Sequence, residues 1–226
     1  MSNWTTTRCK VSGTPEQIRE FREFALRGEP GSDYRVIDFH KIIPVSQNIL
    51  ALARSFIQNR LGGQSLADLA KSQKIPVDFL KTQSEEDFGL YIFARANNSS
   101  WNKWSMKHWG ALRPTAFLDK VYEDDTHLGF SFDIPGGFPE PIFRTLGQKF
   151  PEMSLWCAFY EEDDMDCGYG YFTPVRGTEI GEEFAVCNSD ESDYVYSLVF
   201  DEERRDYDDG LDEDEAPQNE APQPPP

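Results

Sequence analysis

Three of the five tryptophans in the chain fall within nine consecutive residues: Trp101, Trp104 and Trp109. If this segment winds as a helix, Trp101, Trp104 and His108 recur three and four residues apart and lie on one face. Ser100 fits the N-cap of such a helix, and Gly110 fits the position just after its last turn. We therefore expect a short helix with an aromatic face.

The aromatic cluster of this helix has two interpretations. Its members are Trp101, Trp104, His108 and Trp109. In the first interpretation the rings pack into a core, which is where most large apolar side chains lie. In the second they form an exposed hot spot for a partner or a platform on which bases stack. The first interpretation is favoured, because clustered aromatic residues more often build a core.

The opening of the chain predicts the order strand, helix, strand. Residues 4–12 contain several β-forming side chains. Thr14 fits an N-cap, Pro15 the first helical position, and Gln17 the second partner of a capping box. Residues 34–43 alternate in polarity and predict a second strand.

A helical insertion is expected at about residues 45–110. Residues 45–61 keep a helical apolar period, a short helix follows Ser65, another begins near Pro76, and a further one covers residues 84–96. The second half returns to strands, with one helix among them. Strands are expected at 117–122, 128–133, 153–160, 168–173 and 194–200, and a helix at about 142–150.

These elements predict an α+β fold in a single domain over residues 1–200. Residues 201–226 have no apolar periodicity and consist largely of acidic residues and proline. Such a segment buries too little apolar area to offset its conformational entropy, so we expect a disordered acidic tail.

Charge is distributed unevenly along the chain, whose net charge is −18. Residues 1–110 contain 15 basic and 11 acidic side chains, residues 111–200 contain 5 and 18, and residues 201–226 contain 2 and 11. The acidic second half repels phosphate backbones and attracts basic partners, although acidic side chains also serve solubility alone.

Recognised chemical motifs are missing from the sequence. There is no glycine-rich phosphate loop or nucleophile elbow, and the four cysteines (Cys9, Cys157, Cys167 and Cys187) lack zinc-ligand spacing. We therefore expect reduced thiols, no metal, no cofactor and no catalytic residue. Asp38 and Asp133 stand within apolar strands, where a buried carboxylate would need a partner such as Arg35 or Arg113.

No apolar run reaches the roughly 20 residues that cross a bilayer, and the N-terminus does not resemble a signal peptide. The sequence therefore predicts a cytoplasmic protein without membrane contact.

Several short motifs, in this order, resemble the YubB-type proteins of phages and conjugative plasmids, over roughly residues 1–175. They are Val11-Ser12-Gly13, Ile42-Ile43-Pro44, Trp101 with His108-Trp109-Gly110, Phe130-Ser131-Phe132-Asp133, Pro139 with Pro141-Ile142, and Phe150-Pro151 before Tyr160-Glu161-Glu162. The chain departs from that family's pattern at 111–114 and 134–137. The resemblance implies a ferredoxin-like antiparallel sheet in a protein of a mobile element, in a bacterial host cell, and implies no established chemistry.

The first functional hypothesis is a non-enzymatic accessory protein that binds and occludes a basic host or defence protein through an acidic surface. Its carboxylates would stand in for nucleic-acid phosphates, so the protein itself would not bind DNA. The candidate contacts are Glu123, Asp124, Asp125, Glu161, Glu162, Asp163, Asp164, Asp166, Glu182, Glu183, Asp190 and Glu191. No feature of the sequence specifies an oligomeric state.

Two alternatives remain open. One is a nucleic-acid-binding module that uses the first half of the chain through Arg8, Lys10, Trp101, Lys103, Trp104 and Lys107. The other is an enzyme of unknown reaction class with a pocket around Asp38, His108 and Asp133.

Overall fold

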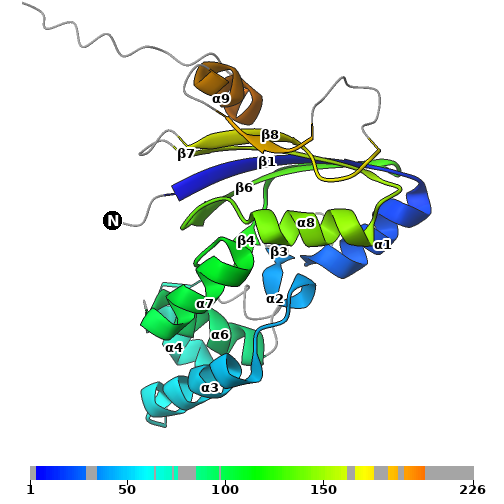
Figure 1. Ribbon diagram of the computed structural model, residues 1–226. Helices are drawn as coiled ribbons and strands as arrows, with labels where there is room; N and C mark the ends of the chain where they lie inside the picture. Colours follow the sequence, from blue (N-terminus) through cyan, green and yellow to red (C-terminus); the bar gives the residue numbers. More distant parts are fainter. Residues whose placement is uncertain are drawn as a thin grey trace, which may run out of the picture.

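The protein has an α+β fold in which helices pack on both faces of an antiparallel sheet (Figure 1). The computed structural model describes residues 4–28, 35–63, 65–72, 74–75, 85–96, 98–161, 166–175, 183–187 and 191–201.

The large sheet has six strands in the order β5-β6-β1-β7-β8-β9, and every neighbouring pair is antiparallel. The strands are β1 (Trp4–Ser12), β5 (Asp119–Glu123), β6 (His127–Pro135), β7 (Ser154–Glu161), β8 (Cys167–Tyr171) and β9 (Ala185–Val186). Strand β1 is central and pairs with β6 and β7 along almost its whole length. The strand predicted over residues 4–12 is confirmed.

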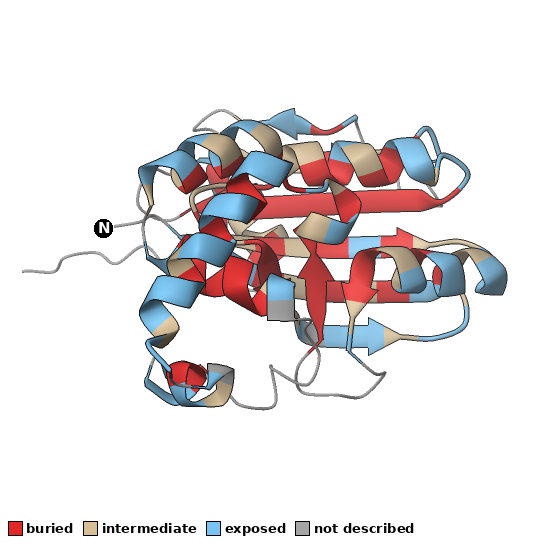
Figure 2. Cartoon of the chain, turned by 90° about the horizontal axis from the view of Figure 1, so that it is seen from below, coloured by how far each residue is buried: buried red, intermediate tan, exposed pale blue. Residues whose placement is uncertain are grey.

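Helices α1 (Pro15–Ala25) and α8 (Glu140–Lys149) cover one face of the large sheet (Figure 1). The predicted capping box of α1 is present: the Thr14 hydroxyl accepts from the Gln17 backbone N–H at 3.3 Å, and Gln17 Oε1 accepts from the Thr14 N–H at 2.8 Å. The inward faces of both helices are buried, whereas their outward faces are exposed (Figure 2). The main core therefore lies between these helices and the sheet.

The insertion lies in the chain between two strands of a second, three-stranded sheet, β3 (Val36–Asp38) and β4 (Thr115–Phe117). The third strand of this sheet is β2 (Leu26–Arg27). The helices of the insertion are α3 (Gln47–Leu61), α4 (Leu66–Ser72), α6 (Glu85–Arg95) and α7 (Ser99–Trp109). They lie on the side of α1 and α8 that faces away from the large sheet (Figure 1). The predicted helices there are confirmed, except that the one near Pro76 lies outside the described residues.

Helix α7 carries the aromatic cluster, and its core interpretation is confirmed for two tryptophans. Trp101 and Trp109 are fully buried. Their ring N–H groups donate to the carbonyls of Leu112 at 2.8 Å and Ile43 at 3.0 Å. Gly110 ends the helix in the left-handed conformation, with φ of 75°.

The predicted N-cap of α7 is wrong by two residues. Asn98 occupies that position, and its side-chain oxygen accepts from the backbone N–H groups of Ser100 and Trp101. Asparagine caps a helix as well as serine does, and here its carbonyl reaches two donors at once.

The strand predicted over residues 34–43 is confirmed only in part. Among the described residues 35–43, Val36–Asp38 is a strand, and the short helix α2 (Phe39–Ile42) follows it in place of the predicted continuation. The carboxylate of Asp38 accepts from the Lys41 N–H at 3.1 Å, so it caps α2. An N-cap at this position outweighs the weak alternation of the segment.

The last predicted strand is a helix, α9 (Ser192–Phe200). Val195 and Val199 lie one helical turn apart and are buried against the face of the large sheet opposite α1 and α8. A short apolar run without strict alternation fits a helix or a strand equally well, and packing decides between them.

The predicted tail lies almost wholly outside the described part of the chain, which ends at Asp201. No helix in the described ranges is both long enough and apolar enough to cross a membrane.

Burial predicts a clear stability difference between two tryptophans of α7. Trp109→Ala should lower the free energy of unfolding by about 3–5 kcal/mol, because it removes a fully buried ring and its hydrogen bond. Trp104→Ala should cost clearly less, because Trp104 is only partly buried. Urea unfolding of both variants measures this, and equal losses would contradict the burial difference.

Candidate binding site

Within the described residues, helix α9 covers only part of the outer face of the large sheet, which points away from α1 and α8. Helix α9 packs on β7 and β8 through a small cluster that includes Trp156, Tyr160, Tyr171 and Val195. It therefore leaves β5 and β6, and part of β1, at the open half of this face (Figure 1).

A row of side chains crosses this outer face from strand to strand. In register, Tyr122 lies opposite Gly129, Gly129 opposite Lys10, Lys10 opposite Trp156, and Trp156 opposite Tyr171. Four of the five positions carry an aromatic ring or an ammonium group. The fifth, Gly129, carries no side chain and leaves a gap in the row.

A groove of about 550 Å³ lies over this gap. Its lining comes from β1, β5, β6, β7, β8 and the end of α9, and includes Ser12, Ser131 and Ser154 beside the residues of the row. A Cβ atom added at Gly129 would lie 3.8 Å from the Cys9 carbonyl oxygen and 3.9 Å from the Tyr122 Cβ. The groove therefore has room above Gly129, and small side chains form much of its floor.

The walls of the groove combine aromatic rings with a cation. Tyr122 is 63% exposed, although its ring borders the groove. On the far side, the Lys10 ammonium lies 5.0 Å from the centre of the Trp156 ring, a cation–π contact.

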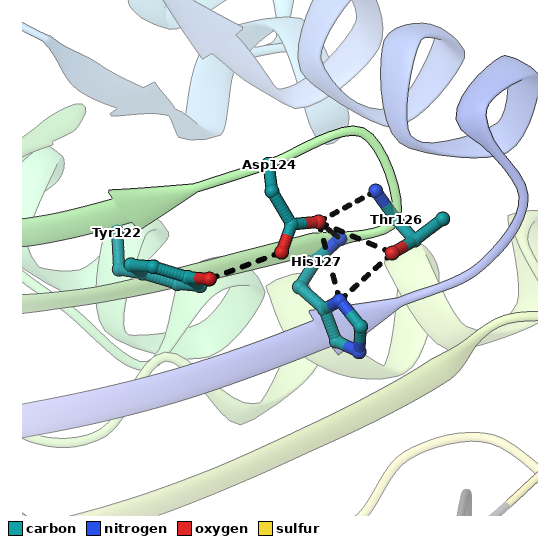
Figure 3. Close-up of polar contacts among 4 residues, drawn as sticks. All are labelled: Tyr122, Asp124, Thr126 and His127. Carbon is teal, nitrogen blue, oxygen red and sulfur yellow. Dashed lines mark hydrogen bonds and ion pairs between the residues drawn. The ribbon is translucent and has the colours of Figure 1, made fainter.

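The turn between β5 and β6 lies at one end of the groove, which Asp124 and His127 line. Figure 3 shows the polar contacts within this turn. Asp124 Oδ1 accepts from the backbone N–H groups of Thr126 at 2.7 Å and His127 at 2.8 Å, and lies 3.2 Å from His127 Nδ1. Asp124 Oδ2 accepts from the Tyr122 hydroxyl at 3.0 Å. One carboxylate therefore holds the turn, the tyrosine ring and the imidazole together.

These hydrogen bonds shift two pKa values. The pKa of Asp124 lies well below its usual range, chiefly because the Thr126 N–H donates to the carboxylate. The same carboxylate raises the pKa of Tyr122, because it accepts the hydroxyl proton.

Arg8 fixes the other end of the groove. Its guanidinium donates to the Leu198 carbonyl at 3.2 Å and forms an ion pair with Asp201, the C-cap residue of α9. Arg8 therefore connects the C-terminal end of α9 to the central strand β1 through a hydrogen bond and an ion pair.

The structure does not bring the predicted acidic contacts together. Asp124 and Asp125 follow β5 at one edge of the large sheet, whereas Asp166, Glu183 and Glu191 lie near β8 and β9 at the opposite edge. Five further candidates lie outside the described residues: Glu162, Asp163, Asp164, Glu182 and Asp190.

Two of the predicted acidic contacts do not face solvent. Glu123 forms ion pairs with Arg22 and Arg35, and its side chain is 17% exposed. Glu161 is buried, with 6% exposure. Their placement in a partner-binding surface is wrong, because strand pairing turns both side chains toward the protein.

The three residues of the predicted enzyme pocket lie apart from the groove. Asp38 is buried and pairs with Arg27, not with the predicted arginines, and burial raises the pKa of Asp38. Asp133 is exposed and accepts from the Thr6 hydroxyl at 2.7 Å. His108 stacks on Trp104 at 4.7 Å between ring centres. None of the three lines the groove.

The cysteines are free thiols. Cys9 and Cys157 face each other across β1 and β7 with their sulfur atoms 3.2 Å apart, and burial raises the pKa of Cys157. In the part of the chain that the structure describes, no three His, Cys, Asp or Glu side chains are grouped as metal ligands would be.

Comparison with known proteins does not assign the chain to a family, and no family model matches it. A cysteine–tRNA ligase from Desulforamulus reducens is 28% identical over 152 residues, which are 67% of this chain and 28% of the ligase. A cysteine–tRNA ligase from Histophilus somni is 28% identical over 105 residues, 46% of this chain and 22% of the ligase. The chain therefore spans about a quarter of the length of these curated relatives.

Among solved structures, protein api92 from Yersinia pseudotuberculosis resembles the chain with a TM-score of 0.39 and 11% identity. The match covers 82% of this chain and 99% of api92.

The Asp124 network predicts a pH-dependent contribution to stability. Because folding lowers the pKa of Asp124, the stabilisation is fully present above its ordinary pKa of 3.8 and is lost as the pH falls through the folded value. The difference in melting temperature between the wild type and Asp124→Asn should be largest at pH 7 and shrink below about pH 4. Asp125→Asn removes one charge from the same turn and is the control; a difference that stays constant down to pH 2.5 would contradict the network.

Proposed function

We propose that the chain is a non-catalytic binding protein whose ligand lies in the groove on the open half of the large sheet. The row from Tyr122 across Gly129 and Lys10 to Trp156 carries this proposal. It places two aromatic rings and a cation around a position that has no side chain of its own.

The dimensions and chemistry of the groove support a small-molecule site. Such sites in proteins usually enclose about 300–1,000 Å³ and combine apolar walls with a few polar groups. The groove encloses about 550 Å³, and its polar groups include the ammonium of Lys10, the imidazole of His127 and several serine hydroxyls.

The charges around the groove favour a small ligand over a nucleic acid strand. The two cations, Arg8 and Lys10, are matched by the carboxylates of Asp124 and Asp201 in the same lining. The chain as a whole carries −18, so it repels a phosphate backbone. The nucleic-acid alternative also loses one of its two aromatic rings, because Trp101 is fully buried and only the partly buried Trp104 remains.

The acidic-surface hypothesis has weaker support from the same geometry. Exposed carboxylates such as Asp125 and Glu183 lie at opposite edges of a six-stranded sheet. At about 4.8 Å between neighbouring strands, five spacings separate these edges by about 24 Å. A partner would therefore have to span the width of the sheet to contact both groups.

The strand order also supports a ferredoxin-like core, as the resemblance to YubB-type proteins implies. In this proposal β1, α1, β5, β6, α8 and β7 form the βαββαβ unit, with sheet order β5-β6-β1-β7. The three-stranded sheet and the helical insertion then interrupt the unit after α1, and β8, β9 and α9 extend it.

Filling the groove tests the proposal. Gly129→Leu places a side chain into it, and the strand position accommodates the Cβ without strain. A library of small aromatic compounds is screened by ligand-observed NMR against the wild type. We expect compounds that bind the wild type to lose at least tenfold in affinity with Gly129→Leu.

Gly89→Ala is the matched control for this screen. Gly89 lines a separate hollow of about 350 Å³ between α3 and α6, and a Cβ there would lie 3.4 Å from Ile57 Cγ1. If Gly89→Ala removes binding and Gly129→Leu does not, the ligand lies in the insertion. If no compound binds the wild type, the proposed function is wrong.

A further inference from the structure

We infer that Cys167 and Cys187 form a disulfide in the folded protein when a small neutral disulfide oxidises them, and that this bond fixes β9 at the edge of the large sheet. The two cysteines lie at the opposite edge of the sheet from Tyr122. The inference therefore goes beyond the proposed function and is tested independently of it.

The register of β8 and β9 places the two cysteines directly opposite each other. Gly168 pairs with Val186 in this antiparallel ladder, so Cys167, one residue earlier, faces Cys187, one residue later. The Cys187 N–H donates to the Cys167 carbonyl at 2.8 Å, as this pairing requires. Directly opposite residues of an antiparallel pair have Cα atoms about 4.5–5.5 Å apart, within the range of about 4.4–6.8 Å that a disulfide bridges.

Both thiols lie on the outer face of the sheet, beside α9. Cys167 belongs to the buried cluster of Trp156, Tyr160 and Val195, and Cys187 packs against the same cluster. Burial, followed by the nearby Cys167 thiol, raises the pKa of Cys187 to about 12. A disulfide would therefore join two side chains that already share one face and one cluster.

The difference in exposure determines the order of the two exchange steps. Cys187 is half-buried, so an oxidant reaches its sulfur, whereas Cys167 is 1% exposed. The Cys187 thiol loses its proton to solvent and attacks one sulfur of the oxidant, which releases one thiol and leaves a mixed disulfide on Cys187. Cys167 then loses its proton, attacks Cys187 Sγ and releases the second thiol. The two cysteines lose two electrons and two protons, which the oxidant gains as it becomes two thiols.

The surroundings of the pair determine the class of the oxidant and the speed of the reaction. Burial is the main cause that raises the pKa of Cys167, and the carboxylates of Glu191 and Asp166 raise it further. The same carboxylates repel an anionic disulfide such as oxidised glutathione, so a neutral disulfide is favoured. Because few thiolates are present at neutral pH when the pKa is raised, the exchange is slow.

A disulfide at this position changes how firmly β9 is attached. The strand consists of Ala185 and Val186, which are both exposed, and it is the outermost strand of the sheet. It lies so close to Gly168 that an added Cβ atom there would be 2.8 Å from the Ala185 carbonyl oxygen. So short a strand forms few hydrogen bonds and opens easily. A covalent bond beside this close approach would keep β9 paired with β8.

The second cysteine pair of the chain provides an internal control. Cys9 and Cys157 also lie opposite each other, on β1 and β7, with their sulfur atoms 3.2 Å apart. Both are fully buried in the main core, so an oxidant does not reach them while the protein is folded. The two pairs therefore share the cross-strand arrangement and differ in access.

Oxidation of the native full chain with 2-hydroxyethyl disulfide tests the inference. The remaining thiols are alkylated at intervals, and peptide mass spectrometry identifies the bonds that have formed. We expect a disulfide between Cys167 and Cys187 to form at least tenfold faster than one between Cys9 and Cys157. Oxidised glutathione at the same concentration should react more slowly than the neutral disulfide.

Variants and hydrogen exchange separate the parts of the inference. Cys187→Ala should abolish disulfide formation in the native chain, whereas Cys9→Ala, the matched control in the core pair, should leave the bond between Cys167 and Cys187 unchanged. Hydrogen exchange on the wild type requires no variant. Oxidation should slow exchange of the Cys187 amide at least tenfold and leave the Gly129 amide unchanged.

The inference is overturned if the native chain forms no disulfide between Cys167 and Cys187, or if the core pair oxidises as fast. A mixed disulfide that persists on Cys187 would also contradict it, because Cys167 would then be out of reach. Equal rates with oxidised glutathione would refute the class of oxidant. An unchanged exchange rate of the Cys187 amide after oxidation would refute the attachment of β9.

Discussion

The pairing of β1 with both β6 and β7 is the constraint on which the rest of the structure depends. Because side chains alternate along a strand, this pairing sends Cys9 and Val11 into the core under α1 and α8. The same alternation sends Arg8 and Lys10 to the outer face. A shift of one residue in the register would move the core-facing side chains of β1 to the outer face and the outer ones into the core. Burial of the core therefore determines the register, and the register determines which side chains line the groove.

The sequence predicted correctly those helix ends that are formed by residues close together in the chain. Thr14 and Gln17 form the capping box that the sequence indicates, and Gly110 ends α7 in the left-handed conformation. The predictions were wrong where the secondary structure of a segment depends on packing against a distant element, or where another residue caps the helix. Residues 194–200 form a helix because their apolar side chains pack on the sheet, and nothing within the segment itself distinguishes that outcome from a strand.

The groove could not be predicted from the sequence in the same way. Its row joins Lys10, Tyr122, Gly129 and Trp156, which come from four strands, and no local pattern specifies which residues of those strands face each other. The available signals were the alternating polar residues of β1 and the glycine within the apolar strand β6. The spatial arrangement of the candidate acidic contacts could not be predicted for a related reason. Strand pairing buries Glu161 and places described carboxylates such as Asp125 and Glu183 at opposite edges of the sheet.

Backbone amide chemical shifts, measured while an aromatic compound that binds the wild type in the library screen is titrated into the isotopically labelled full chain, test the central claim most directly. If the row of side chains from Tyr122 to Trp156 is the binding site, the largest changes in chemical shift should occur at the amides of Gly129 and Lys10 and at the indole N–H of Trp156. Those changes should saturate with one dissociation constant. Saturable binding that leaves these three signals unmoved, and shifts amides of α3 and α6 instead, would contradict the account.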